Sequence, residues 1–202
     1  MEVRSESFGQ NHQLTFVDKL GIWMSTRRIV RLIKQRNVKS MADVGCGFNA
    51  QLSQLTRGLV SKSVLVDVAL RDDLKNSPDY ESHTGLLPGV LNSLEKQTLD
   101  LIVFNAVLEH LDEPIETLRE LKLILAPNGV LFINVPSWFG KRILEFFAFK
   151  LNLSPADEME DHRRYYNKRE LWLEIRAAGF MPSKIKIRRH KFMGALFAVV
   201  ES

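Results

Sequence analysis

Residues 43–50, with the sequence Asp-Val-Gly-Cys-Gly-Phe-Asn-Ala, constrain the fold more than any other part of the chain. Residues 39–44 predict a buried strand, Gly45 and Gly47 predict a tight turn, and a helical pattern begins at Gln51. A strand–turn–helix unit presents bare backbone N–H groups and the positive end of a helix to a polar ligand. We therefore expect a ligand site at this turn.

Helical and strand patterns alternate along the rest of the chain, which predicts an α/β fold with a mostly parallel sheet covered by helices on both faces. The predicted strands are 39–44, 64–66, 80–84, 99–104 and 130–135, followed by an edge hairpin of 184–188 and 192–200. Asp43, Asp67 and Asn105 each end a predicted strand, so we expect them to line one crevice at the carboxyl edge of the sheet.

Several local patterns make narrower predictions about the helices. The first helix, 16–33, is expected to bury Leu20 and Trp23 and to expose its arginines. The second is expected to bury Leu52, Leu55 and Leu59 on one face. Asp112 is predicted to be the N-cap of a helix that runs to about residue 125, a turn is predicted at 127–129, and Asn167 with Glu170 predicts a capping box.

Composition places the chain among ordinary globular domains. Its 202 residues are 45% hydrophobic and 26% charged with a formal charge of +4, which permits an anionic partner without requiring one. The single cysteine, Cys46, excludes an internal disulfide, and we interpret it as a small residue tolerated in the turn. No apolar run approaches the roughly 20 residues that span a bilayer, and residues 1–14 are polar and expected to be loosely ordered, so we expect a cytoplasmic protein.

The glycine turn alone fits two ligands. Gly45-x-Gly47-x-x-Ala50, with Asp67 about 20 residues later, matches a dinucleotide fingerprint. Asp43 argues against that ligand, because a carboxylate two residues before the first glycine would repel a diphosphate. The same carboxylate suits a ligand that carries an amino group or a sulfonium.

Ordered blocks of the chain resemble the class I S-adenosylmethionine (SAM) dependent methyltransferases across residues 38–200. The blocks are D-V-G-C-G at 43–47, L-V-D at 65–67, L-D-L-I-V through V-L-E-H at 99–110, P-N-G at 127–129, and H-R-R-Y-Y, E-L and A-A-G-F between 162 and 180. The resemblance implies a three-layer αβα sandwich with a seven-stranded sheet of order 3-2-1-4-5-7-6, strand seven being antiparallel. It implies one methyltransferase domain over 1–202, made of a helical cap (1–37), a SAM-binding core (38–135), a substrate-side insertion (136–166) and a C-terminal helix and hairpin (167–202).

The resemblance also implies roles for individual residues. The backbone of Gly45, Cys46 and Gly47 would approach the methionyl part of SAM, with Asp43 near its amino group. Asp67, beside Val68, would accept both ribose hydroxyls, and Asn105 would lie near the sulfonium. Asn49 replaces the third glycine of the motif and is expected to tolerate a positive φ, whereas no residue near 84–86 is assigned to the adenine.

Two histidines are candidate general bases, His110 and His162. Some quinone-pathway O-methyltransferases that the chain resembles carry E-x-x-E-H and bind a metal there, but Ala106 replaces the first glutamate, so no metal is expected. The alternative for Glu109 and His110 is that they orient the loop before the next helix. His162 is otherwise a loop anchor.

The sequence leaves the acceptor open. Residues 138–153 are aromatic-rich and would form a lid, a membrane-resting patch or a buried helix. The basic runs 162–169 and 184–191 could bind RNA phosphates. Lys184, Lys186 and Arg188, however, alternate with isoleucines as the solvated face of a strand does, so nucleic-acid binding is not expected. We predict a SAM-dependent methyltransferase of a small molecule, lipid-linked or sugar-derived; a NAD-type oxidoreductase and a non-catalytic module of the same fold remain alternatives.

Overall fold

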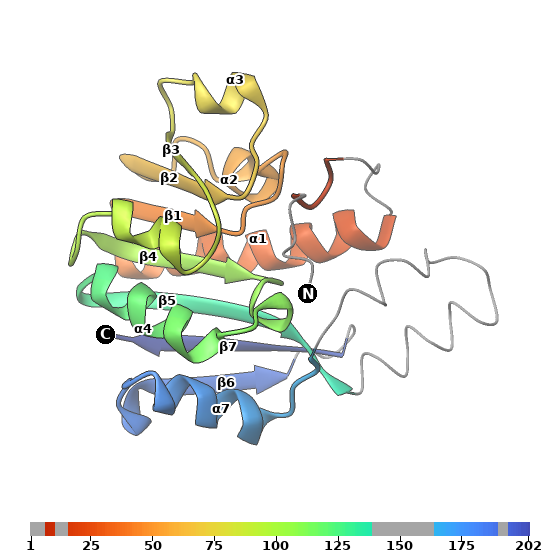
Figure 1. The fold of residues 1–202 in the computed structure, drawn as a ribbon, viewed down its shortest axis with the longest axis vertical. Coiled ribbons are helices and arrows are strands. Elements are labelled where there is room, and N and C mark those ends of the chain that lie inside the picture. The colour runs from red at the N-terminus through yellow and green to blue at the C-terminus, as the bar shows by residue number, and fades with distance from the viewer. Residues whose placement is uncertain (1–6, 11–15, 139–163, 190–193) are drawn as a thin grey trace.

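The computed structural model describes residues 7–10, 16–138, 164–189 and 194–202, and these residues form a three-layer αβα structure around one mixed sheet (Figure 1). The strands are β1 (Ser40–Val44), β2 (Lys62–Asp67), β3 (Glu81–Thr84), β4 (Leu99–Asn105), β5 (Leu125–Pro136), β6 (Ile185–Arg189) and β7 (Ala195–Glu201). The helices are α1 (Phe16–Arg36), α2 (Gln51–Leu55), α3 (Asp72–Lys75), α4 (Pro114–Ile124) and α7 (Lys168–Ala177), with short 3₁₀ turns η1 (Gly89–Ser93), η2 (Leu108–His110) and η3 (Pro182–Lys184).

The sheet has the order β3-β2-β1-β4-β5-β7-β6. The first five of these strands are parallel, and β7 runs antiparallel to both β5 and β6. The predicted topology is therefore confirmed, including the C-terminal hairpin at the sheet edge. Because β1, β2 and β4 are parallel neighbours, their carboxyl ends lie at one edge, where Asp43, Asp67 and Asn105 are found.

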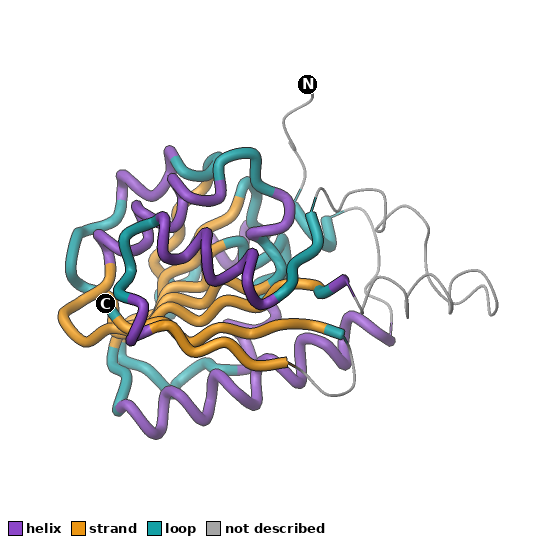
Figure 2. The backbone as a smooth tube through the Cα atoms, turned by 90° about the horizontal axis from the view of Figure 1, so that it is seen from below, coloured by secondary structure: helices purple, strands orange, loops and turns teal. Residues whose placement is uncertain are grey.

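Successive residues of the buried strands pack on opposite sides of the sheet, because side chains alternate between its faces. Ala42 and Val44 pack with α4, α7 and η1 on one face, whereas Met41 packs with α1 on the other. Figure 2 shows these helices on the two sides of the strands. Both faces are covered, which explains the continuous apolar runs in the central strands.

The predicted apolar faces of the first two helices are wrong in part. Ile29 and Ile33 of α1 are buried, but Leu20 is 37% exposed and Trp23 is 50% exposed. The second helix is only five residues long, so Leu52 is buried while Leu55 and Leu59 are exposed. The helical spacing of apolar residues does not reveal how much of a helix the neighbouring elements cover.

Three predictions about element ends are tested by the backbone. Glu113, not Asp112, holds the N-cap position of α4, and the Glu113 side chain makes no capping hydrogen bond. The predicted turn at 127–129 lies inside β5 as an irregularity in its pairing with β4, with Asn128 at φ +65°. The capping box of α7 is confirmed: the Asn167 side chain accepts from the Glu170 N–H at 3.0 Å, and Glu170 Oε2 accepts from the Asn167 N–H at 2.8 Å.

No helix within the described ranges combines the length and the apolar character that crossing a bilayer would need.

Candidate cofactor site

The glycine turn has the geometry expected of a close backbone approach. Gly45 and Gly47 have φ values of +72° and +75°, which residues with a Cβ rarely adopt. A Cβ on Gly45 would lie 2.3 Å from Cγ2 of Val107, so the loop after β4 sits directly against the turn. The Gly45 N–H donates to the Val66 carbonyl at 2.7 Å and ties the turn to the end of β2.

The next positive φ falls on Ala50, at +41°, and not on Asn49 as predicted. Asn49 instead uses its side chain, whose Nδ2 donates to the Gly9 carbonyl at 3.2 Å. The Phe48 N–H donates to the Phe8 carbonyl at 2.9 Å. Residues 7–10, which were expected to be loosely ordered, therefore lie on the turn. The sequence could not predict this contact, because every residue has a backbone carbonyl.

Asp67 joins the end of β2 to the turn. One carboxylate oxygen accepts from the Gly47 N–H at 2.8 Å and the other accepts from the Val68 N–H at 2.8 Å. Each oxygen has two lone pairs, so both can still accept from a ligand hydroxyl. A carboxylate held by backbone donors beside a turn that admits no Cβ is a suitable cradle for the ribose and methionyl parts of SAM.

Asp43 lies beneath the turn and is 2% exposed. Its Oδ2 accepts from the Ser53 hydroxyl at 2.8 Å, a partner from α2 that sequence reasoning missed. Burial raises the pKa of the Asp43 carboxyl to about 7; the Ser53 hydrogen bond opposes this rise, and the nearby charge of Asp67 adds to it. Burial and the same two carboxylates also raise the pKa of the Cys46 thiol, which keeps it protonated and unreactive.

Asn105 ends β4 at the same edge of the sheet. Its Oδ1 accepts from Nδ2 of Asn134 on β5 at 3.1 Å, so the two amides hold each other in place. Ala106, which follows with φ +56°, donates its N–H to the Asn134 carbonyl at 2.8 Å. This bond directs the chain after β4 back toward the glycine turn, where Val107 meets Gly45.

The end of β3 supplies the side of the site for which the sequence offered no residue. The Gly85 N–H donates to the Asp67 carbonyl at 3.0 Å, so the chain leaves β3 beside Asp67. The next residue, Leu86, is 50% exposed. An exposed apolar side chain therefore directly follows the residue that bonds to Asp67.

Glu109 and His110, which follow each other in the chain, differ in burial. Glu109 is fully buried, whereas His110 is half-buried in η2, which follows Asn105 at the carboxyl edge. A negative charge on Glu109 contributes to raising the pKa of the nearby Tyr166 hydroxyl, although burial is the larger cause. Of the two side chains, only that of His110 is partly accessible to solvent.

Tyr166 belongs to a polar cluster beside the carboxyl end of β5. Its hydroxyl donates to Glu174 Oε2 at 3.0 Å, and Arg164 Nη1 contacts Glu174 Oε1 at 3.4 Å. Arg164 Nη2 also donates to the Asp112 carbonyl at 3.4 Å. The cluster holds residues 164–166 to both α7 and the loop before α4. The other candidate base, His162, and residues 139–153 of the aromatic-rich segment lie outside the described residues, so its three alternatives stay untested.

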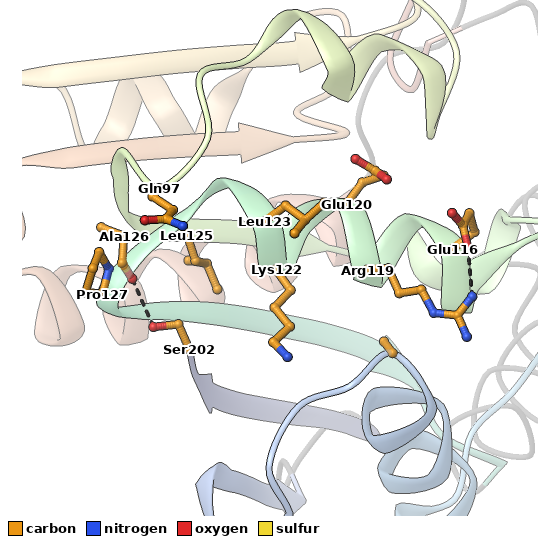
Figure 3. Close-up of a pocket in the computed structure, with 11 residues that line it drawn as sticks. Gln97, Glu116, Arg119, Glu120, Lys122, Leu123, Leu125, Ala126, Pro127 and Ser202 are labelled. Carbon is orange, nitrogen blue, oxygen red and sulfur yellow. Dashed lines mark hydrogen bonds and ion pairs between the residues drawn. The ribbon is translucent and has the colours of Figure 1, made fainter.

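A pocket at the opposite edge of the sheet is a separate feature (Figure 3). It is lined by the outer side of α4, the start of β5 and Ser202 at the chain end. None of the predicted site residues lines it. Because ligands of open α/β sheets bind beyond the carboxyl ends of the strands, we do not assign the cofactor to this pocket.

Comparison with known proteins agrees with this geometry. A family model described as "Methyltransferase domain" matches residues 23–183. A search of curated proteins finds no match. Among solved structures, a SAM-dependent methyltransferase from Archaeoglobus fulgidus is 15% identical, with a TM-score of 0.65 over 90% of this chain and 94% of that one.

Two further structures share the fold at similar distance. The 1,6-didemethyltoxoflavin-N1-methyltransferase of Burkholderia thailandensis, with S-adenosylhomocysteine bound, is 15% identical, with a TM-score of 0.63 over 93% of this chain and 80% of that one. The magnesium protoporphyrin IX methyltransferase of Synechocystis, also with S-adenosylhomocysteine, is 17% identical, with a TM-score of 0.63 over 95% and 90%. The family match, on this fold and with this glycine turn, confirms the predicted enzyme class and its cofactor: the chain belongs to the family of class I SAM-dependent methyltransferases.

Proposed function

We propose that this enzyme transfers the methyl group of SAM to a small-molecule acceptor, lipid-linked or sugar-derived. The observation that carries the cofactor assignment is the Asp67 carboxylate, which backbone N–H groups hold at the carboxyl edge with lone pairs left for the ribose hydroxyls. A small acceptor is supported by two structural neighbours, which are named for a toxoflavin precursor and for magnesium protoporphyrin IX.

Each part of the cofactor has a proposed partner. Asp67, with Val68 beside it, would bind the ribose, and Leu86 would cover the adenine. The backbone from Gly45 to Gly47, including Cys46, would contact the methionyl part, with Asp43 toward its amino group and Asn105 toward the sulfonium. When bound, SAM supplies a methyl group on a positively charged sulfur, which is the electrophile and the leaving group of an in-line displacement.

The enzyme's contribution is then to align the acceptor and to exclude water. Residues 136–166 are proposed to enclose the acceptor, because they leave the sheet at the carboxyl end of β5 and return to it at Tyr166. His110 is the proposed base for an acceptor that must lose a proton, and His162 would be the second candidate.

Calorimetry on Asp67→Ala, with Asp100→Ala as a matched control, tests the cofactor assignment. Asp100 also accepts from two backbone N–H groups, those of Lys39 and Ser40, but at the opposite edge of the sheet. We expect Asp67→Ala to weaken SAM binding by about 100-fold, since it loses two hydrogen bonds to a charged group. Asp100→Ala should bind SAM as the wild type does. Unweakened binding in Asp67→Ala would refute the ribose assignment.

Labelled SAM incubated with a cell extract tests the acceptor class. A labelled small molecule, separated from protein and nucleic acid, is the expected product. Label that appears only in protein or nucleic acid would overturn the proposed acceptor class while leaving the cofactor site intact.

A further inference from the structure

Helix α1 carries the whole positive excess of the chain. Within Phe16–Arg36 there are six basic residues and one acid, Asp18, a net charge of +5. The complete chain has a net charge of +4, so the remaining residues sum to −1. A charge concentrated on one helix is a local property of the surface, and it points to a partner of opposite sign.

The outward side of α1 mixes this charge with large apolar side chains. It consists of exposed residues spaced along successive turns: Lys19, Leu20, Trp23, Arg27, Arg31 and Lys34. The Arg27 guanidinium lies 4.8 Å from the centre of the Trp23 ring. In the part of the chain that the structure describes, the one α1 cation engaged in an ion pair is Arg36, with Glu201. Intramolecular salt bridges therefore do not explain why this side is basic.

The basic surface continues past the helix onto the last two strands. The Arg28 guanidinium lies 4.5 Å from the centre of the Phe197 ring of β7. Arg188 of β6 pairs with Phe197 in the sheet, so its side chain emerges on the same face. Basic groups thus flank Phe197 from both the helix and the edge strand.

We propose that α1 is a docking surface for an anionic lipid bilayer, with the helix lying parallel to the membrane plane. Basic side chains near the surface attract anionic headgroups, while Trp and Leu enter the boundary between headgroups and acyl chains. Leu20 favours a lipid over a nucleic acid as the partner. The bases of a nucleic acid stack on aromatic rings, whereas an exposed aliphatic side chain one turn away offers them no stacking surface.

This docking would also turn the carboxyl edge of the sheet toward the membrane. Leu20 and Trp23 lie in the half of α1 that starts at the carboxyl edge of the sheet, toward which the parallel strands point in Figure 1. Docking through that half brings the edge with the glycine turn toward the bilayer. The proposal itself rests on α1 and on the β6–β7 face, and holds whatever the acceptor is.

Flotation with vesicles of phosphatidylcholine, with and without phosphatidylglycerol, tests the docking. The wild type should float only with the anionic vesicles and should be released by high salt. Each basic residue near the membrane contributes roughly fivefold to partitioning, so R27E/R31E/K34E should partition at least about 100-fold less. The control K96E/K168E/R169E reverses as many exposed charges away from α1 and should float like the wild type.

Two further readouts separate the apolar contribution from the ionic one and check the fold. The chain has three tryptophans, so in W138F/W172F the fluorescence reports on Trp23 alone and should shift to the blue when anionic vesicles are added. Calorimetry with SAM shows whether each variant still folds and binds its cofactor. The proposal is wrong if the wild type does not float with anionic vesicles at low salt, or if both triple variants lose binding equally. It is also wrong if single-stranded RNA binds the protein more tightly than the vesicles do at the same salt.

Discussion

The two halves of the carboxyl edge are built in different ways. In the cofactor half, β1, the glycine turn and β2 are joined by backbone N–H groups and the two acids Asp43 and Asp67, within 25 residues of sequence. In the half proposed for the acceptor, the Tyr166 hydroxyl donates to Glu174, and Arg164 contacts both Glu174 and the Asp112 carbonyl. The first half depends on backbone geometry and the second on side chains, so substitutions in the two should have separable effects.

The largest effect is expected for Gly45→Ala. The new Cβ would meet Val107 at 2.3 Å in a backbone with positive φ, which should cost roughly 3–5 kcal/mol of stability and abolish SAM binding. Gly58→Ala is the control, because Gly58 has φ +76° but nothing within 4 Å of its Cβ position. It should cost about 1–2 kcal/mol and bind SAM normally. Denaturant melts and calorimetry measure both, and equal losses in the two variants would refute the close approach.

A pH-dependent effect is expected at Asp43. Its folded pKa of about 7 lies above the unfolded value of 3.8, so the neutral carboxyl is the favoured folded form. Its contribution to stability is complete below the unfolded pKa and is lost as the pH rises to about 7, a decline of roughly 2–4 kcal/mol. Asp43→Asn should flatten this part of the curve of unfolding free energy against pH. A decline that persists unchanged in Asp43→Asn would assign it to other groups.

A moderate effect confined to stability is expected at Tyr166. Tyr166→Phe removes the donor to Glu174 and should cost roughly 1–2 kcal/mol without changing the affinity for SAM. Tyr80→Phe removes a buried hydroxyl that has no hydrogen-bond partner among the described residues, and should be neutral or slightly stabilising. Thermal melts and SAM titrations compare the two variants. A loss of SAM affinity in Tyr166→Phe would show that the two halves are coupled.

The smallest effect concerns two helix starts in the acceptor half. Asn167→Ala breaks the capping box of α7 and should cost about 1 kcal/mol. Glu113→Ala alters the N-cap position of α4, where the Glu113 side chain makes no capping hydrogen bond, and should cost less than about 0.5 kcal/mol. Urea unfolding resolves the difference, and equal costs would mean that the cap of α7 contributes nothing.

The order of strands and helices could be predicted because each element carries its own local pattern. The apolar runs of β1, β2 and β4 and the turn glycines Gly45 and Gly47 are all features within a few residues of each other. The capping box at Asn167 and Glu170 was found for the same reason, since its partners are three residues apart. The predicted N-cap at Asp112 failed although its residue type was suitable, because several neighbouring positions could have begun the helix.

Contacts between distant residues could not be predicted. The Phe8 carbonyl that receives the Phe48 N–H, and the Val107 side chain that blocks a Cβ on Gly45, depend on where the folded chain brings those atoms. Leu20 and Trp23 fit the apolar period of α1, yet the sheet reaches only the side that holds Ile29 and Ile33. The sequence by itself determined the fold and the cofactor class, because backbone geometry and strand ends specify both locally. Only the tertiary structure decided which side chains enclose the site and which face of α1 stays exposed, because burial depends on what lies opposite.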